Sequence, residues 1–163
     1  MRVFLDTNVW LSATVFSGLC DEILQQCAAR GWLYSSKLVR HAAHEVLQRK
    51  FPQAPRSRKL FDAVWQAAQL IDDVAQPPDD NDARLVAAAT AADMEMFVTG
   101  DKRVLRWKHP RGKLYVMRIE PPRQAWKALF GPTKEHSEGK QPKANSSRAP
   151  RGRVGGMAGE SLS

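Results

Sequence analysis

Four acidic residues of this 163-residue chain occupy positions where carboxylates could do chemistry together: Asp6, Glu45, Asp82 and Asp101. Asp6 directly follows the short apolar segment 2–5, and Asp101 follows a second apolar segment that ends at Thr99. Ligands of open α/β sheets bind beyond the carboxyl ends of the strands. If the two segments are neighbouring strands, both carboxylates therefore face the same crevice. Taken alone, each aspartate also fits a strand-end residue that bonds to loop backbone.

Glu45 and Asp82 belong to segments with helical periodicity. Around its helix, Glu45 falls within about 20° of Leu38, inside the apolar stripe that Ala42 and Val46 continue. An inward carboxylate at that place needs a cation or a hydrogen-bond partner, whereas a residue at the edge of the stripe needs neither. Asp82 opens an alanine-rich helix after a proline-containing loop, where an acid also serves as a cap or as a partner of the helix dipole.

Carboxylates gathered in one place repel one another unless a positive charge lies among them, and a divalent cation supplies that charge. Ligation by carboxylates alone favours Mg²⁺ or Mn²⁺ over Zn²⁺. The chain carries a net charge of +8, from 25 Lys and Arg against 17 Asp and Glu, which suits a polyanionic partner. These features together predict hydrolysis of a phosphodiester by metal-activated water.

The elements that must position these acids alternate along the chain. The expected strands are 2–5, 32–35, 71–75, 95–99 and 114–119. The expected helices are 19–28, 36–50 with Ser36 as N-cap, 56–70, 82–92, 102–107 and a last one that opens at Pro121. Strands that are separated by helices throughout indicate a parallel sheet with helices on both faces. The predicted fold class is therefore α/β, a three-layer sandwich around a central parallel sheet.

Composition predicts one folded domain at 1–130 and a disordered basic tail at 131–163, since the tail is rich in Gly, Ser, Pro, Lys and Arg. No apolar run approaches the ~20 residues of a membrane span. The N-terminus lacks the apolar stretch of a secretory signal. Cys20 and Cys27 stand too far apart on one helix for a disulfide and are expected as free thiols. We therefore expect a cytoplasmic protein without a membrane contact.

Three segments resemble the motifs of PIN domains. VFLDTNVWLSA resembles their opening strand with the first acidic motif, HAAHEVLQRKF their second helix with its acid, and PPDDNDARLVAAATAADMEMFVTGDKRVL their third and fourth motifs. The resemblance covers roughly residues 1–130, and the pairing of DTN with TGD is fairly specific. It implies a Rossmann-like PIN fold and an endoribonuclease that depends on Mg²⁺ or Mn²⁺. For short bacterial members it also implies a VapC-like toxin of a toxin–antitoxin pair.

The resemblance carries over to individual residues of this chain. It implies that the metal-binding, catalytic acids are Asp6, Glu45, Asp82 and Asp101, with Asp79 and Asp80 as alternatives for the third motif. Thr99 is expected to position a metal-bound water or Asp101, and Asn8 to hold Asp6 or contact a phosphate. Lys102 and Arg103 are candidates for binding substrate phosphates, although a solvated helix face explains them equally well.

The resemblance implies three partners: an RNA substrate, a cognate antitoxin and, in some members, a second copy in a homodimer. One rival is a phosphatase of the haloacid dehalogenase type, whose nucleophilic Asp also follows the first strand. That chemistry calls for a second Asp two residues on, where this chain has Asn8. Another rival is a catalytically silent PIN domain that binds RNA or a protein, against which the presence of all four acids argues.

Three aromatic or imidazole side chains fall in or near these motifs. His41 and His44 do not match the spacing of a zinc HExxH motif, so we expect surface or packing histidines. Trp10, which follows the first motif, is expected either in the core or stacked on a base.

Overall fold

A five-stranded, all-parallel sheet in the order β3-β2-β1-β4-β5 forms the centre of the computed structural model, which describes residues 1–74, 80–107 and 117–131. The strands are β1 (Val3–Leu5), β2 (Leu33–Ser35), β3 (Gln69–Leu70), β4 (Met96–Val98) and β5 (Arg118–Glu120). β1 lies in the middle, with β2 on one side and β4 on the other. The residue after β1 therefore lies at the centre of the carboxyl edge of the sheet.

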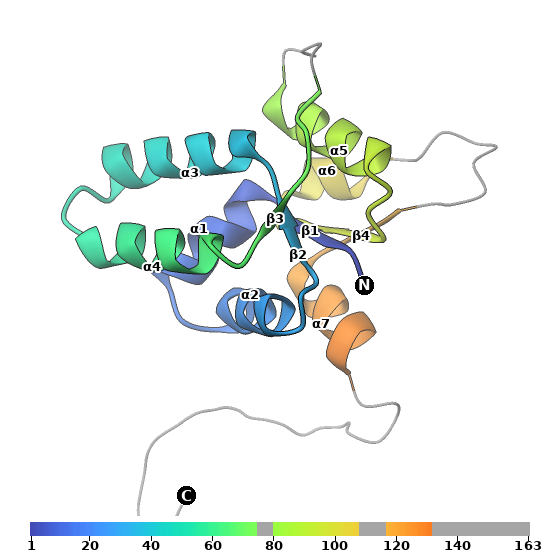
Figure 1. Cartoon of the computed structure of the whole chain (residues 1–163), viewed down its shortest axis with the longest axis horizontal. Helices are drawn as coiled ribbons and strands as arrows, with labels where there is room; N and C mark the ends of the chain where they lie inside the picture. The colour runs from blue at the N-terminus through green and yellow to red at the C-terminus, as the bar shows by residue number, and fades with distance from the viewer. Residues whose placement is uncertain (75–79, 108–116, 132–163) are drawn as a thin grey trace, which may run out of the picture. The chain divides into compact units, whose positions relative to one another are not determined.

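Helices connect the strands in the described part of the chain. They are α1 (Thr7–Val15), α2 (Leu19–Ala29), α3 (Lys37–Lys50), α4 (Pro55–Trp65), α5 (Asn81–Ala91), α6 (Lys102–Leu105) and α7 (Pro122–Phe130). Because parallel crossovers are right-handed, the path β1-β2-β3 places α1–α4 on one face, and the return through β4 to β5 places α5 and α6 on the other (Figure 1). The predicted α/β sandwich with a central parallel sheet is confirmed.

An aromatic cluster holds α1 against α4. The Trp10 ring lies 4.9 Å from the Phe61 ring and 5.5 Å from the Trp65 ring, and Phe61 stacks on Trp65 at 5.7 Å. Trp10 is fully buried. Of the two alternatives for Trp10, the core is confirmed and stacking on a base is excluded, because the ring is fully buried.

Three elements differ from the sequence prediction on the β1–β3 side. The segment after Asp6, which is not among the expected helices, is helix α1, whose sequence TNVWLSATV is apolar on most sides and shows no amphipathic period. The helix expected to reach residue 70 ends at Trp65, and the strand expected at 71–75 lies at Gln69–Leu70. Both residues of this edge strand are exposed, so no buried apolar run marks them; their position is set by pairing with β2.

Other predictions fall at the limits of the described residues. Residue 75 and residues 114–116 of the expected strand 114–119 lie outside them, and β5 is Arg118–Glu120. Residues 132–163 of the predicted tail also lie outside them, while the unit that contains the sheet spans Met1–Trp126. Cys20 and Cys27 are free. Within the described ranges, no helix has both the length and the apolar character that crossing a bilayer requires.

Candidate active site at the carboxyl edge of β1 and β4

Asp6 and Thr99 meet where β1 and β4 end. Leu5 pairs with Val98 in the parallel register, so the next residues on the two strands are also neighbours. The Thr99 hydroxyl donates a hydrogen bond to Asp6 Oδ2 at 2.8 Å. Both residues are fully buried. The parallel pairing of two segments far apart in the sequence thus fixes the first carboxylate of the site.

Three aspartates of the site also cap helices. One oxygen of each accepts from a backbone amide: Asp6 Oδ1 from Thr7 at 2.7 Å, Asp80 Oδ1 from Asp82 at 2.8 Å and Asp101 Oδ1 from Arg103 at 2.8 Å. These aspartates are the N-caps of α1, α5 and α6. The cap fixes one oxygen of each carboxylate, while the second oxygen contacts Asn8 and Thr99 in Asp6 and Arg103 in Asp80 and Asp101.

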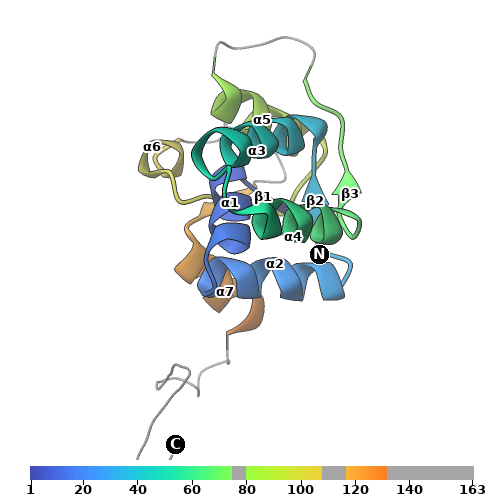
Figure 2. The same cartoon turned by 90° about the vertical axis from the view of Figure 1, so that its left-hand side faces the viewer.

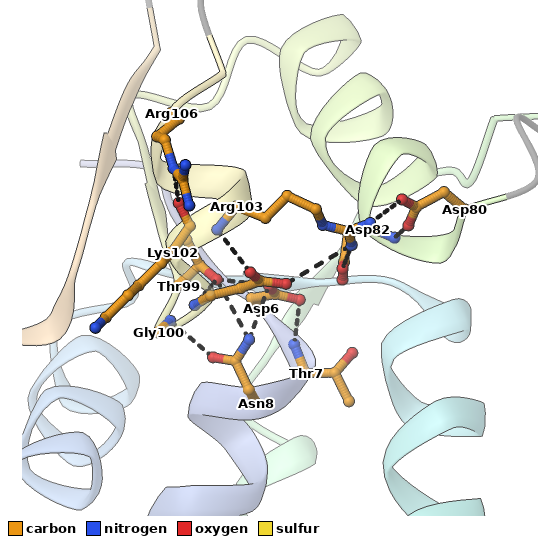
Figure 3. Close-up of polar contacts among 11 residues, drawn as sticks. Asp6, Thr7, Asn8, Asp80, Asp82, Thr99, Gly100, Lys102, Arg103 and Arg106 are labelled. Atoms are coloured by element: carbon orange, nitrogen blue, oxygen red, sulfur yellow. Dashed lines mark hydrogen bonds and ion pairs between the residues drawn. The ribbon is translucent and has the colours of Figure 1, made fainter.

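Asn8 and Thr99 connect the two strand ends. The Asn8 amide donates to Asp6 Oδ2 at 3.1 Å and to Thr99 Oγ1 at 3.3 Å, and its carbonyl oxygen accepts from the Gly100 amide at 2.9 Å. Thr99 Oγ1 in turn accepts from the Asp101 amide at 3.0 Å. The motifs DTN and TGD thus form one hydrogen-bonded unit in which Asn8 holds Asp6 and Thr99 holds the turn at Asp101 (Figure 3).

Arg103 places its guanidinium among the remaining carboxylates. Its Nη1 lies 2.9 Å from Asp80 Oδ2, and its Nη2 lies 2.6 Å from Asp82 Oδ2 and 3.7 Å from Asp101 Oδ2. The three acids raise the pKa of Arg103, Asp80 most of all. Lys102, the other basic residue proposed for substrate, points away from the acids (Figure 3). The positive charge that the clustered acids require is therefore supplied here by Arg103.

The acids remain electrostatically crowded. Burial raises the pKa of Asp6 to about 6, with a further contribution from the charges of Asp82 and Asp101, while the hydrogen bonds from Thr99 and Thr7 act in the opposite direction. Burial and the neighbouring Asp80 also raise the pKa of Asp82, and the contacts with Arg103 lower it. The site therefore disfavours its own full ionisation and favours the uptake of positive charge.

Glu45 does not face the core, so the helical-stripe prediction for it is wrong. The buried residues of α3 are Val39, Ala43 and Leu47, and Glu45 is exposed. It stands two residues from both Ala43 and Leu47, about 200° around the helix from each. Exposure leaves the assignment of Glu45 as a metal-binding acid a prediction. Contacts with Arg103 and the charges acting on Asp6 group Asp6, Asp80, Asp82 and Asp101; Asp79 lies outside the described residues.

Ser36 is a neighbour of the site that sequence reasoning assigned only to a helix cap. It is the N-cap residue of α3, but its side chain makes no capping bond, because the Asp73 carboxylate accepts from the Leu38 amide at 3.1 Å instead. The register of β1 and β2 places Ser36 beside Asp6. Its buried hydroxyl has no hydrogen-bond partner among the described residues. Register, which requires the sheet order, is the signal that identifies it.

The donor set suits a hard divalent cation, since Asp6, Asp82 and Asp101 offer only carboxylate oxygens, and the charges of Asp82 and Asp101 contribute to the raised pKa of Asp6. In the described part of the chain, no group of three or more His, Cys, Asp or Glu is arranged to hold a metal ion. Arg103 lies against Oδ2 of Asp82 and Oδ2 of Asp101, which are oxygens that would be ligands. The residue types thus fit the cation, and binding it requires Arg103 to release them.

Comparison with known proteins agrees with this geometry. The family model described as PIN domain matches residues 2–103, which is more than half of the chain and includes every motif of the hydrogen-bonded unit. A search among curated proteins found no match. The parallel sheet, the acids at the ends of β1 and β4 and the extent of the match agree with one another. The chain belongs to the PIN-domain family.

Proposed function

We propose that this protein is a metal-dependent endoribonuclease that hydrolyses phosphodiester bonds of RNA. PIN domains are generally nucleases, and they generally use divalent metal ions. The observation that carries the proposal is the buried Asp6 carboxylate, fixed by Asn8 and Thr99 at the edge of the sheet and close enough to Asp82 and Asp101 for their charges to raise its pKa. A basic chain of net charge +8 suits a polyanionic substrate.

The residues that would hold Mg²⁺ or Mn²⁺ are Asp6, Asp82 and Asp101. Bound there, the ion would lower the pKa of a water molecule and offset negative charge on the phosphate. Hydrogen bonds from Asn8 and Thr99 hold the Asp6 carboxylate in a fixed orientation, so this side chain need not move when the ion binds. Arg103, once released from the acids, is positioned to meet a phosphate oxygen through its planar pair of donors.

The finer assignment concerns biological context. The resemblance of the motifs to those of short bacterial PIN proteins supports a toxin of a toxin–antitoxin pair, acting in the cytoplasm. The partners proposed with it are a cognate antitoxin that covers the acidic site and a second copy of the chain. These assignments rest on the resemblance, and the nuclease proposal is independent of them.

A second candidate is a catalytically silent PIN domain that binds RNA or a protein. Two observations favour it: Arg103 already neutralises the cluster, and Glu45, the fourth expected acid, is exposed on α3. The two candidates differ in whether metal displaces Arg103 from the carboxylates.

A cleavage assay separates the candidates. Purified protein is incubated with mixed RNA, and separately with single-stranded DNA, in the presence of Mg²⁺, Mn²⁺ or EDTA. We expect metal-dependent cutting of RNA that is lost in Asp6→Asn and Asp101→Asn and kept in Asp72→Asn, a change at an exposed aspartate outside the cluster. Glu45→Gln tests whether the exposed acid takes part. If wild type binds RNA but never cuts it with any metal, the silent-domain candidate replaces the nuclease.

A further inference from the structure

A basic groove lies between α3, α4 and β3, apart from the aspartate cluster. It is a cavity of about 340 Å³ lined by Lys37, Arg40, His41, His44, Trp65 and Leu70. Figure 2 shows α3 and α4 side by side next to β2 and β3. The nuclease site described above uses none of these side chains.

The four basic residues of the groove share one face of α3, since they follow one another at intervals of three, one and three residues. His44 belongs to the fold: its Nε2 lies 2.7 Å from Asp62 Oδ1 and its ring packs edge-on against Phe61. Lys37, Arg40 and His41 are exposed. Among the described residues, neither Lys37 nor Arg40 forms an ion pair, so both charges face the groove's solvent uncompensated.

The position of these charges on the helix is itself unfavourable. Lys37 and Arg40 lie within the first four residues of α3, and its first turn contains no acid. Cations at a helix N-terminus oppose the helix dipole, whereas an anion there is stabilised. The Asp73 carboxylate satisfies the Leu38 amide but forms no ion pair with either cation in the described part of the chain. An external anion in the groove would therefore offset both unfavourable charges.

The groove also lies close to the cleavage site along the same edge of the sheet. α3 begins directly after β2, and β2 pairs in parallel with β1, whose end carries Asp6. Neighbouring strands are about 5 Å apart, so the start of α3 is one strand spacing from Asp6. Leu70, 51% exposed, and the edge of Trp65 supply apolar surface in the groove that can contact a base or a ribose.

We infer that the groove between α3, α4 and β3 binds the phosphate backbone of single-stranded RNA through Lys37 and Arg40, and so holds the strand whose bond is cut at the aspartates. The inference rests on the proposed nuclease function. It adds the side of the site from which the RNA enters: across β2 towards β3.

Binding without cutting tests this inference. A fluorescently labelled single-stranded RNA is titrated in EDTA and followed by anisotropy at several salt concentrations. The double variant Lys37→Ala, Arg40→Ala is compared with the control Arg58→Ala, Lys59→Ala, which removes the same charge from exposed residues that line a neighbouring cavity. We expect at least a tenfold weaker Kd for the groove variant only. The slope of log K against log salt should fall by about 1.4, or about 0.7 for each phosphate that the variant no longer neutralises.

A charge-conserving variant, Lys37→Arg with Arg40→Lys, should retain most of the binding, and thermal melts show that each variant is folded. Equal weakening by the groove variant and the control overturns the inference, because general positive charge would then explain binding. Unchanged binding, or no RNA binding by wild type, overturns it too. Cleavage is measured separately with Mn²⁺. If the wild type binds RNA without cutting it, and only the groove variant binds RNA more weakly, the nuclease proposal is wrong and the groove assignment stands.

Discussion

Replacing Asp6 by Asn should change the pH dependence of stability in a defined direction. In metal-free protein the buried Asp6 carboxylate is held close to Asp82 and Asp101, and its pKa is raised from 3.8 to about 6. A raised pKa means that the folded state prefers the protonated acid, so the ionised acid destabilises the fold above pH 6. Asn carries no charge and removes this destabilisation.

The magnitude follows from the pKa difference and the hydrogen bonds. A shift from 3.8 to about 6 corresponds to about 3 kcal/mol at pH 7.5. Against this gain, an Asn amide group at one oxygen position faces donors from Asn8 and Thr99, a mismatch that costs about 1–2 kcal/mol. We therefore expect Asp6→Asn to be about 1–2 kcal/mol more stable than wild type at pH 7.5. Near pH 4 most of the charge effect is absent, and the variant should be about 1 kcal/mol less stable.

Urea unfolding in EDTA between pH 4 and pH 7.5 measures both values. The control Asp72→Asn makes the same substitution at an exposed position and should follow wild type at every pH. A variant that is less stable than wild type by the same amount at both ends of the pH range would refute the reasoning, because burial would then impose no charge penalty on Asp6.

Three further predictions test other contacts. Arg103→Gln removes the cation that competes for the carboxylates, so calorimetry should show that Mn²⁺ binds about tenfold more tightly than in wild type. This factor corresponds to the loss of one charge-assisted hydrogen bond. Unchanged or weaker Mn²⁺ binding would mean that Arg103 does not occupy the metal position. Thr99→Val removes a hydroxyl that lowers the pKa of Asp6, so carboxyl NMR should show that pKa above about 6, and urea unfolding a loss of about 1–3 kcal/mol; an unshifted pKa would contradict the hydrogen bond. Phe61→Ala should lower stability by about 3–5 kcal/mol because it empties the centre of the aromatic cluster, whereas Leu60→Ala, at a 38% exposed neighbour, should cost less than about 1 kcal/mol; similar losses would place Phe61 outside the core.

The fold can be predicted from the sequence because it depends on the alternation of strand and helix segments along the chain. Apolar segments between helical periods require a parallel sheet, and a parallel sheet places strand-end residues at one edge. This reasoning brings Asp6 and Asp101 together without a structure. Prediction from hydrophobic periodicity fails for two elements. Edge strand β3 has no buried residue, and α1 is so apolar that no amphipathic period marks it as a helix.

The side chains of the site depended on details that periodicity does not contain. The prediction for Glu45 used a stripe centred on Leu38, Ala42 and Val46, whereas the core uses the residues one position later, a difference of about 100°. Spacing could not show that Asp80 caps α5 or that both Asp80 and Asp82 form ion pairs with Arg103. Charge makes Arg103 a candidate for substrate binding or for a solvated helix face, and charge alone does not give its rotamer; the structure aims its guanidinium at the carboxylates.

The hydrogen bond between Thr99 and Asp6 joins residues 93 positions apart. During synthesis at about 5–20 residues per second, roughly 5–20 seconds therefore separate the appearance of the two partners. Until β4 has been made and has paired with β1, Asp6 lacks both Thr99 and the turn that carries Asp101. A nascent chain of this protein thus leaves the ribosome's exit with its acids still unassembled, and the site is complete only after nearly all of the sheet has been translated.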